Sequence, residues 1–435
     1  MQAEATQFTN RQFAGLMAGV SVGSVFEWYD FFLAAAAAAS VWPRIFFPAK
    51  FDPAIALAIS VSTVGLAYFA RPLGAIVFGH FGDKYGRRNS LVWTLIVMGA
   101  SCVGTAVLPP FASIGLLALA ILIVLRFLVG FGLGGEMGGA SSWVLEAKPG
   151  AKHRGFWISW PFAVLAIGKL LAILAFYIAS ASLANAAYYD WGWRVPFAVG
   201  ALMLGVGFFV RLKIMESPMF QQLQVKRTIL KYPAFQVIRE QGRKIFILAM
   251  IGCCNSIANI VILPYSISYL VKLGVDEAFA NLSVTGGSAA AFFTCLGGAY
   301  LSDYVGRLKV LRASVVLIIL MMFPYFFLLN TLNPLWIMVA QILLYGVILV
   351  GNGVVSILMV ESFATKYRYS GSGITYQFSQ LVWGGLPIAI LLPVFILTYG
   401  VVGASQPVIW TIIALCIAAG VASFFVKETR GTTLE

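Results

Sequence analysis

The chain has 435 residues, of which 60% are hydrophobic and only 10% charged, and its net charge is +13 at pH 7. A soluble protein carries roughly 25% charged residues, so this composition, with its apolar residues in long blocks, excludes a soluble globular protein and predicts a polytopic all-α membrane protein. The basic residues lie in short loops on alternate sides of the apolar blocks, which argues against nucleic acid as a partner.

Apolar runs bounded by proline, glycine and charge clusters predict twelve membrane spans. Each run is long enough to cross a hydrocarbon layer that requires about 20 residues. In chain order we expect the spans at residues 12–42, 54–81, 90–109, 113–146, 155–182, 193–214, 243–271, 277–302, 308–329, 334–365, 370–399 and 405–427.

One sizeable polar segment, residues 215–242, interrupts these spans. It is basic and weakly amphipathic, which predicts a cytoplasmic linker near the membrane surface. We therefore expect an N-terminal six-helix bundle over residues 1–214 and a C-terminal one over residues 243–435.

The distribution of lysine and arginine predicts the orientation. If the N-terminus is cytoplasmic, 22 of the 29 basic residues fall in cytoplasmic segments. The positive-inside rule then predicts that both termini are cytoplasmic and that the protein is a multi-pass protein of the inner or plasma membrane. Four basic residues fall outside (Arg44, Lys50, Arg194 and Lys272), and three fall within spans (Arg71, Arg126 and Lys169).

The two halves of the chain repeat each other. Asp83-x-x-Gly86-Arg87 returns 220 residues later as Asp303-x-x-Gly306-Arg307, and Glu146 returns as Glu361. Because each half contains an even number of spans, both halves cross the membrane in the same direction. Parallel six-helix repeats of this kind are typical of transporters.

Several motifs resemble those of the major facilitator superfamily. The loop that carries the first repeated motif reads GHFGDKYGRR, and the fourth span contains RFLVGFGLGG. The segments EWYDF, GGEMGGASSWVLEAKPGAKHRG, GWRVPF and ESPMF are similar to those of its metabolite:proton symporter branch, which includes carriers of citrate, 2-oxoglutarate, shikimate, and proline or betaine. The resemblance extends over nearly the whole chain and implies the major facilitator fold.

Six charged residues lie inside spans of the N-terminal half. At a rise of 1.5 Å per residue, four of them lie about 18–22 Å from one end of their spans. A charge at the bilayer centre costs about 2.5–3.5 kcal/mol even on lenient scales, so such residues are expected to be functional, although structural pairing also contributes. The acids are Glu27, Asp30 and Glu136, and the bases are Arg71, Arg126 and Lys169.

The acids are the candidate proton carriers. Glu27 and Asp30 are three residues apart, so they share one helix face. Burial favours the protonated form of a carboxyl group and a nearby arginine favours the ionised form, so a carboxyl balanced between the two can load and release a proton. We expect Asp30 to be the main carrier, followed by Glu27 and then Glu136. The family resemblance associates Arg126 with proton coupling.

The bases are the candidate ligands of an anionic substrate. Arg71 and Arg126 each offer a fork suited to a carboxylate. For Lys169 two interpretations stay open: a salt bridge to Glu27 or Asp30, or a ligand of the substrate carboxylate.

The spans of the C-terminal half offer only neutral polar residues for the substrate. They could hydrogen-bond its uncharged part, or could equally hold helices together. These residues are Asn255, Asn259, Tyr265, Tyr376, Gln377 and Gln380.

The repeated loop motif is the candidate latch. The family resemblance implies that its aspartates and arginines form a cytoplasmic latch between the halves, which breaks as the carrier rocks. In the second copy Ala299 replaces a glycine, so the two latches could differ. The latch residues are Gly79, Asp83, Gly86, Arg87, Arg88, Asp303, Gly306 and Arg307.

Together these features predict a monomeric secondary transporter in contact with lipid, not an enzyme. The five cysteines lie in apolar segments, so neither a disulfide framework nor a metal site is expected, and no cofactor beyond the coupling proton. The hypothesis is proton-coupled uptake of a small mono- or dicarboxylate by alternating access. A proton-coupled zwitterion carrier, an uncoupled facilitator and a transporter-like sensor are the alternatives.

Overall fold

A computed structural model describes residues 8–48, 50–260 and 265–432, with the side chains of residues 54, 185, 259, 260 and 278 left undescribed. The described residues form helices and their connections, without β-strands. The all-α prediction is therefore confirmed.

The N-terminal half contains helices α1 to α10. The first, α1, is closed at its start by a capping box in which Thr9 and Gln12 exchange hydrogen bonds. The helices of this half are α1 (Asn10–Ser40), α2 (Trp42–Ile45), α3 (Pro53–Tyr85), α4 (Arg87–Val107), α5 (Phe111–Ile114), α6 (Leu116–Ala147), α7 (Arg154–Ala163), α8 (Leu165–Ser182), α9 (Asn185–Asp190) and α10 (Val195–Leu212).

The C-terminal half contains helices α12 to α19 and follows the short helix α11 (Pro218–Val225). Two π-helical segments, Leu381–Gly385 and Pro387–Leu391, connect α17 to α18. The helices of this half are α12 (Pro233–Ile260), α13 (Ser266–Lys272), α14 (Glu277–Val305), α15 (Arg307–Asn330), α16 (Pro334–Glu361), α17 (Arg368–Gln380), α18 (Leu392–Gly403) and α19 (Ser405–Ala422).

These helices match the twelve predicted spans. Ten helical segments of the described chain are long and apolar enough to cross a membrane, and α1 and α12, of 31 and 28 residues, complete the set. The segment expected as a linker, residues 215–242, is partly helical because it contains α11 and the start of α12. A kink at Gln241 separates that start from the membrane part of α12. Residues 261–264 of the expected seventh span lie outside the described residues.

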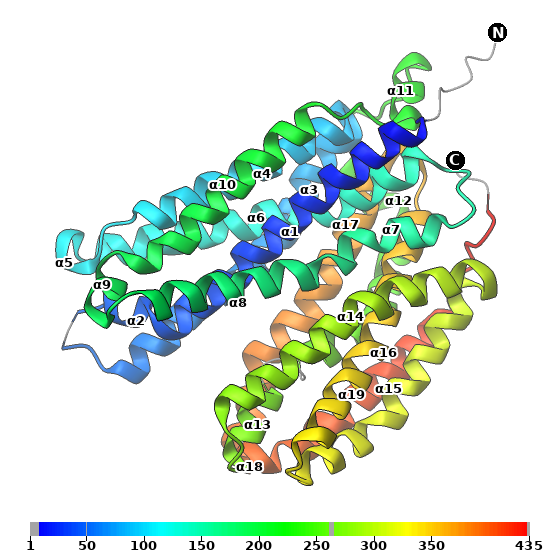
Figure 1. Cartoon of the computed structure of the whole chain (residues 1–435). Coiled ribbons are helices and arrows are strands. Elements are labelled where there is room, and N and C mark those ends of the chain that lie inside the picture. Colours follow the sequence, from blue (N-terminus) through cyan, green and yellow to red (C-terminus); the bar gives the residue numbers. More distant parts are fainter. Residues whose placement is uncertain (1–7, 49, 261–264, 433–435) are drawn as a thin grey trace.

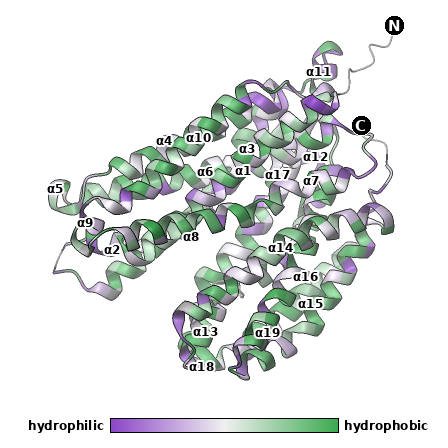
Figure 2. Cartoon of the chain, in the orientation of Figure 1, coloured by the Kyte–Doolittle hydropathy of each residue, from purple (hydrophilic) through white to green (hydrophobic). Residues whose placement is uncertain are grey.

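The two halves pack against each other through equivalent helices. Helix α17 packs on α3 and α6, and α7 packs on α14 and α16. Both termini lie at the same end of the molecule, which we call the terminal end (Figure 1). The ribbons of the two halves meet there and diverge toward the opposite end. Hydrophobic residues cover most of the helix surfaces, and hydrophilic ones gather near the helix ends (Figure 2).

Glycines on α6 let neighbouring helices approach its backbone. An added Cβ at Gly134 would overlap the carbonyl oxygen of Arg71, and one at Gly138 would lie 2.6 Å from the Cα of Gly373. Gly130 meets the backbone of Ala67 in the same way. These three glycines therefore pack α6 against α3 and α17.

Candidate functional site

Two aspartates join the halves at the terminal end. Asp83, near the end of α3, accepts hydrogen bonds from the backbone N–H groups of residues 369 and 370, at 3.1 and 2.8 Å. Asp303, near the end of α14, accepts hydrogen bonds from those of residues 155 and 156, at 3.0 and 3.2 Å. The first N–H groups of a helix lack partners within it and carry partial positive charge. Each aspartate therefore caps the start of a helix, α17 or α7, in the other half.

A buried glutamate, Glu146 at the end of α6, lies between arginines of both halves. It accepts a hydrogen bond at 3.0 Å from Arg87 of its own half and another at 3.0 Å from Arg368 of the other half. Arg87 also donates to Asp83 at 2.7 Å and to the carbonyl oxygen of Thr365 at 2.6 Å. These five residues form one charge network across the boundary between the halves.

The equivalent glutamate of the C-terminal half, Glu361, makes the mirrored contacts. It pairs with Arg307 of its own half at 3.3 Å and with Arg154 of the other half at 2.6 Å. Arg154 is slightly less enclosed than Arg368, with 11% of its side chain exposed against 0%. The sequence repeat therefore corresponds to a repeat of contacts, and its two copies differ in burial.

The two loop glycines have matching conformations. Gly86 and Gly306 have φ angles of 111° and 115°, which side-chain-bearing residues rarely adopt. Glu216 accepts the backbone N–H of residue 87 at 3.0 Å, and Glu428 accepts that of residue 307 at 3.0 Å. Burial raises the pKa of Glu216. At Glu428 burial acts in the same direction, but hydrogen bonds from several backbone N–H groups outweigh it and lower the pKa.

Two other predicted latch residues behave differently from each other. Gly79 lies against α17, where an added Cβ would be 2.7 Å from the Cα of Ser370. Arg88 instead donates to the carbonyl oxygens of Arg211 and Leu212 at the end of α10, inside its own half. These contacts of Arg88 do not cross between the halves, so the structure gives no support for including it in a latch.

Asp30 and Arg126 form an ion pair in the middle of the N-terminal half. Their closest atoms are 3.4 Å apart, and both side chains are almost fully buried. Arg126 also donates to the hydroxyl oxygen of Thr105 at 2.6 Å and lies over the ring of Trp42. Asp30 is thus neutralised by a base that is itself fixed in position.

Glu136 pairs with a base that the sequence analysis missed. Arg211, near the end of α10, is fully buried and donates to both carboxylate oxygens of Glu136. Thr94 donates to the same carboxylate at 3.0 Å. Arg211 lies within the predicted sixth span, so the spans of this half hold four buried bases and the prediction of three is wrong. Its position inside that span was the signal in the sequence, whereas the close approach of Gly23 on α1, where an added Cβ would overlap the Arg211 guanidinium group, is seen only in the structure.

Glu27 is the third buried acid and differs from the other two. It is fully buried and forms no ion pair with the described basic residues. Both oxygens of its carboxyl group have no hydrogen-bond partner among the described residues, and Glu136, Arg211 and Arg71 are its charged neighbours. Glu27 is therefore a buried acid that no described base neutralises by direct contact.

Arg71 is a buried base held by aromatic rings. It is 3% exposed, and its guanidinium carbon lies 4.3 Å from the ring centre of Tyr68, 4.9 Å from that of Phe31 and 5.7 Å from that of Trp28. Its Nε and Nη2 atoms have no hydrogen-bond partner among the described residues. The rings stabilise the cation through its faces and leave its N–H edge available to a carboxylate.

Lys169 on α8 spans the boundary between the halves. Its ammonium group donates at 2.7 Å to the hydroxyl oxygen of Ser288 on α14 and lies over the ring of Phe32. Lys169 forms no salt bridge to Glu27 or Asp30, the first of the two interpretations given above. Its described polar contact is the hydrogen bond to Ser288 across the boundary.

Three neutral polar residues of the C-terminal half lie on or next to α17, which borders the N-terminal half. Gln377 donates to the carbonyl oxygen of Leu133 at 3.3 Å, across the boundary. Tyr376 packs edge-on against Phe162 of α7, with ring centres 5.3 Å apart. Gln380, at the end of α17, lines the cavity described below. All three residues therefore lie at the boundary between the halves.

The other neutral candidates do not join them. Asn255 faces Gly351 on α16, inside the C-terminal half. Tyr265 donates its hydroxyl group to the carbonyl oxygen of Val401 at 2.8 Å, also within that half. Both side chains therefore point into their own bundle, which favours the second interpretation given above, that they hold helices together. The side chain of Asn259 lies outside the described residues.

A cavity of about 710 Å³ lies between the halves, nearer the end opposite the termini. Its volume is within the range of small-molecule sites, about 300–1,000 Å³. Its wall combines residues of α1 and α3 with residues of α12 and of the segment from α17 to α18. The residues that line it include Phe31, Phe32, Ala35, Val64, Tyr68, Phe69, Ser256, Gln380, Ile388 and Pro393.

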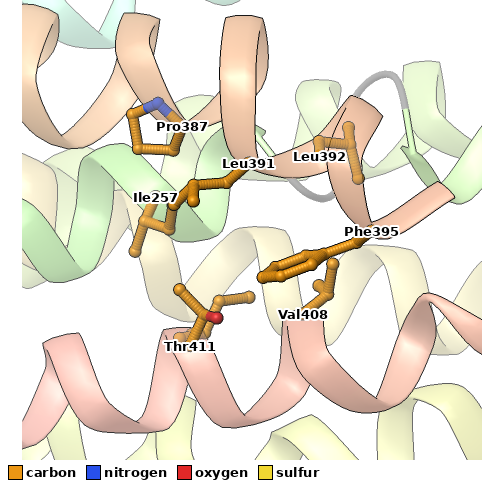
Figure 3. Close-up of a pocket in the computed structure, with 8 residues that line it drawn as sticks. Ile257, Pro387, Leu391, Leu392, Phe395, Val408 and Thr411 are labelled. Atoms are coloured by element: carbon orange, nitrogen blue, oxygen red, sulfur yellow. The ribbon is translucent and has the colours of Figure 1, made fainter. Parts of the chain in front are cut away.

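A second pocket is too small for a substrate. It lies inside the C-terminal half between α12, α18 and α19, and Figure 3 shows its lining of Pro387, Leu391, Phe395 and neighbouring apolar side chains. Its volume is about 20 Å³, which is room for about one water molecule. The cavity between the halves is therefore the candidate substrate site.

Comparison with known proteins agrees with this architecture. Residues 21–387 match the family model described as Major Facilitator Superfamily. The chain is 30% identical to the shikimate transporter of Escherichia coli K12 (95% of this chain and 94% of that protein) and 30% identical to the citrate-proton symporter of Salmonella typhi (96% and 95%). It is also 34% identical to an inner membrane metabolite transport protein of Escherichia coli K12, YhjE, with 83% of each chain covered.

Solved structures agree on the fold. The proton:xylose symporter XylE bound to 6-bromo-6-deoxy-D-glucose superimposes with a TM-score of 0.82 at 17% identity, covering 98% of each chain. The predicted resemblance and fold are therefore confirmed. The chain is a multi-pass transport protein, not an enzyme, and it belongs to the Major Facilitator Superfamily.

Proposed function

We propose that this protein takes up a small organic anion, a mono- or dicarboxylate, by proton-coupled symport and alternating access. The observation that carries the proposal is that two buried bases, Arg71 and Lys169, form no ion pair with the described acids. Unpaired ions inside a membrane protein are costly. A carboxylate bound between the halves would neutralise them.

The buried charges support coupling to a proton. Asp30 is paired with Arg126, and Glu136 with Arg211, so Glu27, Arg71 and Lys169 remain. When Glu27 carries a proton, two positive charges are left for the anion. When Glu27 loses it, one of those charges is cancelled, so anion affinity falls. Proton and anion therefore favour each other's binding.

This charge count changes the order of the candidate proton carriers. The sequence favoured Asp30, but Asp30 is neutralised by Arg126, whereas the buried carboxyl group of Glu27 has no ion pair or hydrogen bond to a described residue. We propose Glu27 as the main carrier, with Glu136 as its nearest acidic neighbour. Asp30 and Arg126 remain a second pair that could respond to protonation. On the substrate side we propose Arg71, Lys169, Tyr376, Gln377 and Gln380.

The contacts at the terminal end support a latch. We propose that Asp83, Arg87, Asp303 and Arg307, with their partners in the other half, hold that end closed and release it when the carrier rocks. The positive-inside distribution favours the cytoplasm for this end and for both termini. Residues 1–214 and 243–435 would then move as two bundles, joined by residues 215–242, within a monomer.

The test is uptake by the purified protein in proteoliposomes, with and without an inward proton gradient. The panel contains monocarboxylates, dicarboxylates, citrate, betaine, proline and sugars. We expect the gradient to drive accumulation of a carboxylate. Accumulation of a zwitterion alone would overturn the anion assignment, and equilibration that is indifferent to the gradient would indicate an uncoupled facilitator.

A further inference from the structure

We infer that the anion is a monocarboxylate with a ring, aromatic or cyclohexyl, that carries few hydroxyl groups. This inference rests on the proposed function and specifies the chemical group to which the carboxylate is attached. It comes from the cavity between the halves, whose wall is largely apolar. Beside that wall lies Arg71, which forms no ion pair with the described acids and has two nitrogens without a hydrogen-bond partner among the described residues.

The wall of the cavity suits a flat apolar group. Four aromatic side chains of the N-terminal half, Phe31, Phe32, Tyr68 and Phe69, line it together with aliphatic residues of both halves. Phe31 and Tyr68 lie edge to face, with ring centres 5.8 Å apart. Aromatic pairs of this geometry readily accept a further ring by stacking or edge contact.

The polar groups of the wall are few, and its two serine hydroxyl groups are already hydrogen-bonded within their own helices, which leaves the hydroxyl group of Tyr68 and the amide of Gln380 for a substrate. None of its described lining residues is charged. The hydroxyl group of Ser62 donates to the carbonyl oxygen of Ala58 at 2.8 Å, and that of Ser256 donates to the carbonyl oxygen of Gly252 at 3.1 Å. A substrate with several hydroxyl or carboxylate groups would leave some of them desolvated and unpaired, which is costly.

Arg71 lies directly beside this wall. It stacks on Phe31 and Tyr68, which both line the cavity. A carboxylate on the N–H edge of Arg71 would therefore hold its attached ring against the same aromatic side chains. One carboxylate and one adjoining ring fit this arrangement.

The second base, Lys169, is less available to a substrate while it is hydrogen-bonded to the other half. Lys169 already donates to Ser288 across the boundary between α8 and α14. A second carboxylate on the substrate would have to displace this bond. The geometry therefore favours one negative charge on the substrate.

The experiment measures binding to the full-length protein in detergent by calorimetry at acidic pH. The ring acids are benzoate and cyclohexanecarboxylate. The comparison ligands are shikimate, which has a hydroxylated ring, lactate, which has no ring, citrate, which has three carboxylates, and benzyl alcohol, which has no charge. We expect the ring acids to bind at least about tenfold more tightly than every comparison ligand, a difference of about 1.4 kcal/mol.

Variants assign this preference to the cavity. Phe69→Ala should weaken ring-acid binding by about tenfold and leave lactate binding unchanged, because the Phe69 ring lines the cavity without a described contact to either base. Phe293→Ala, on the exposed surface of α14, is the matched control and should change neither. Arg71→Gln should abolish selectivity for benzoate over benzyl alcohol.

The outcomes separate this inference from the proposed function. If shikimate, citrate or lactate binds as tightly as the ring acids, the inference is overturned while anion transport stands. If benzyl alcohol matches benzoate, the cavity is an apolar groove without an anion site, and the inference is again overturned. If no carboxylate binds and none accumulates in proteoliposomes, the proposed function itself fails.

Discussion

Glu146 and Glu361 occupy equivalent positions at the ends of α6 and α16, and each accepts hydrogen bonds from one arginine of its own half and one of the other. Each carboxylate therefore balances positive charges that belong to two separate bundles. If these bundles move apart, the shared carboxylate can stay with only one of them. The pairs across the boundary thus contribute to closure of the terminal end.

Removing the charge of Glu146 should open that end more often. In Glu146→Gln the amide can no longer neutralise Arg87 and Arg368, and a hydrogen bond to a charged group contributes about 1.5–3 kcal/mol. A cysteine replacing Ser142, which faces Ser372 across the boundary at 3.5 Å, reports opening through its rate of thiol labelling. We expect that rate to rise about tenfold or more.

Arg88→Gln is the control for this measurement. Arg88 lies at the same end, but the described hydrogen bonds of its side chain stay inside the N-terminal half. Its substitution should leave the labelling rate of the cysteine at position 142 within about twofold of the parent. Equal rates in Glu146→Gln and the parent would show that the network does not hold the end closed.

Glu27→Gln should uncouple transport from the proton. Glutamine resembles the protonated glutamic acid, so the variant should bind the anion with an affinity that no longer depends on pH. In the parent, affinity should fall as pH rises, because loss of the Glu27 proton cancels one of the positive charges that attract the anion. Binding titrations from acidic to alkaline pH check both curves.

Transport by the same variant gives a second reading. Glu27→Gln should exchange labelled for unlabelled anion across the membrane and yet fail to accumulate it with a proton gradient. Asp30→Asn, by contrast, leaves Arg126 without its ion pair, so we expect lower stability and weaker activity overall. Gradient-driven accumulation by Glu27→Gln at the parent rate would sink the assignment of Glu27.

Arg211 should be important for stability. Arg211→Gln leaves Glu136 buried beside Glu27 without its base, and breaking a buried pair of this kind costs about 3–5 kcal/mol. We expect the free energy of unfolding of the purified protein to fall by that amount.

The double variant separates the pair from other effects of the substitution. Adding Glu136→Gln to Arg211→Gln removes the unpaired acid, so it should restore at least about 1 kcal/mol of the loss. Additive losses in the double variant would mean that the two side chains do not depend on each other.

Lys169 should matter for uptake and little for stability, the reverse of what we expect for Arg211. Lys169→Met removes a buried charge that has no described acid partner, so the unfolding temperature should stay the same or rise. Anion uptake at low substrate concentration should fall about tenfold or more, because a charge-assisted hydrogen bond to the carboxylate is lost. Lys226→Met, on the exposed linker, should change neither quantity. A large loss of stability with unchanged uptake would assign Lys169 a structural role.

Much of this architecture could be read from the sequence because it depends on local pattern. Long apolar runs in a membrane form helices, and an Asp-x-x-Gly-Arg motif that returns in both halves indicates that the halves have similar structures. The glycines of α6, spaced four residues apart, likewise allow close packing whichever helix is the partner. These properties are fixed by residue type and spacing, and they held.

The pairing of the buried charges depended on the tertiary structure. Arg211 lies near the end of its helix, where a basic residue is expected to reach water, yet α1 and α10 pack so closely at Gly23 that its side chain turns inward to Glu136. Lys169 could have faced Glu27 or Asp30 by depth alone, but the rotation of α8 directs it to Ser288 on α14. Tyr265 and Asn255 turn into their own half for the same reason.

Residue type and spacing were sufficient to predict the fold family, the spans and most of the charges inside the membrane, with Arg211 as the exception. Only the packing of the helices decided which acids and bases pair and which remain for a proton and a substrate. The physical reason is that hydropathy and spacing fix how deep a residue lies, whereas the rotation and tilt of each helix against its neighbours fix which way its side chain points.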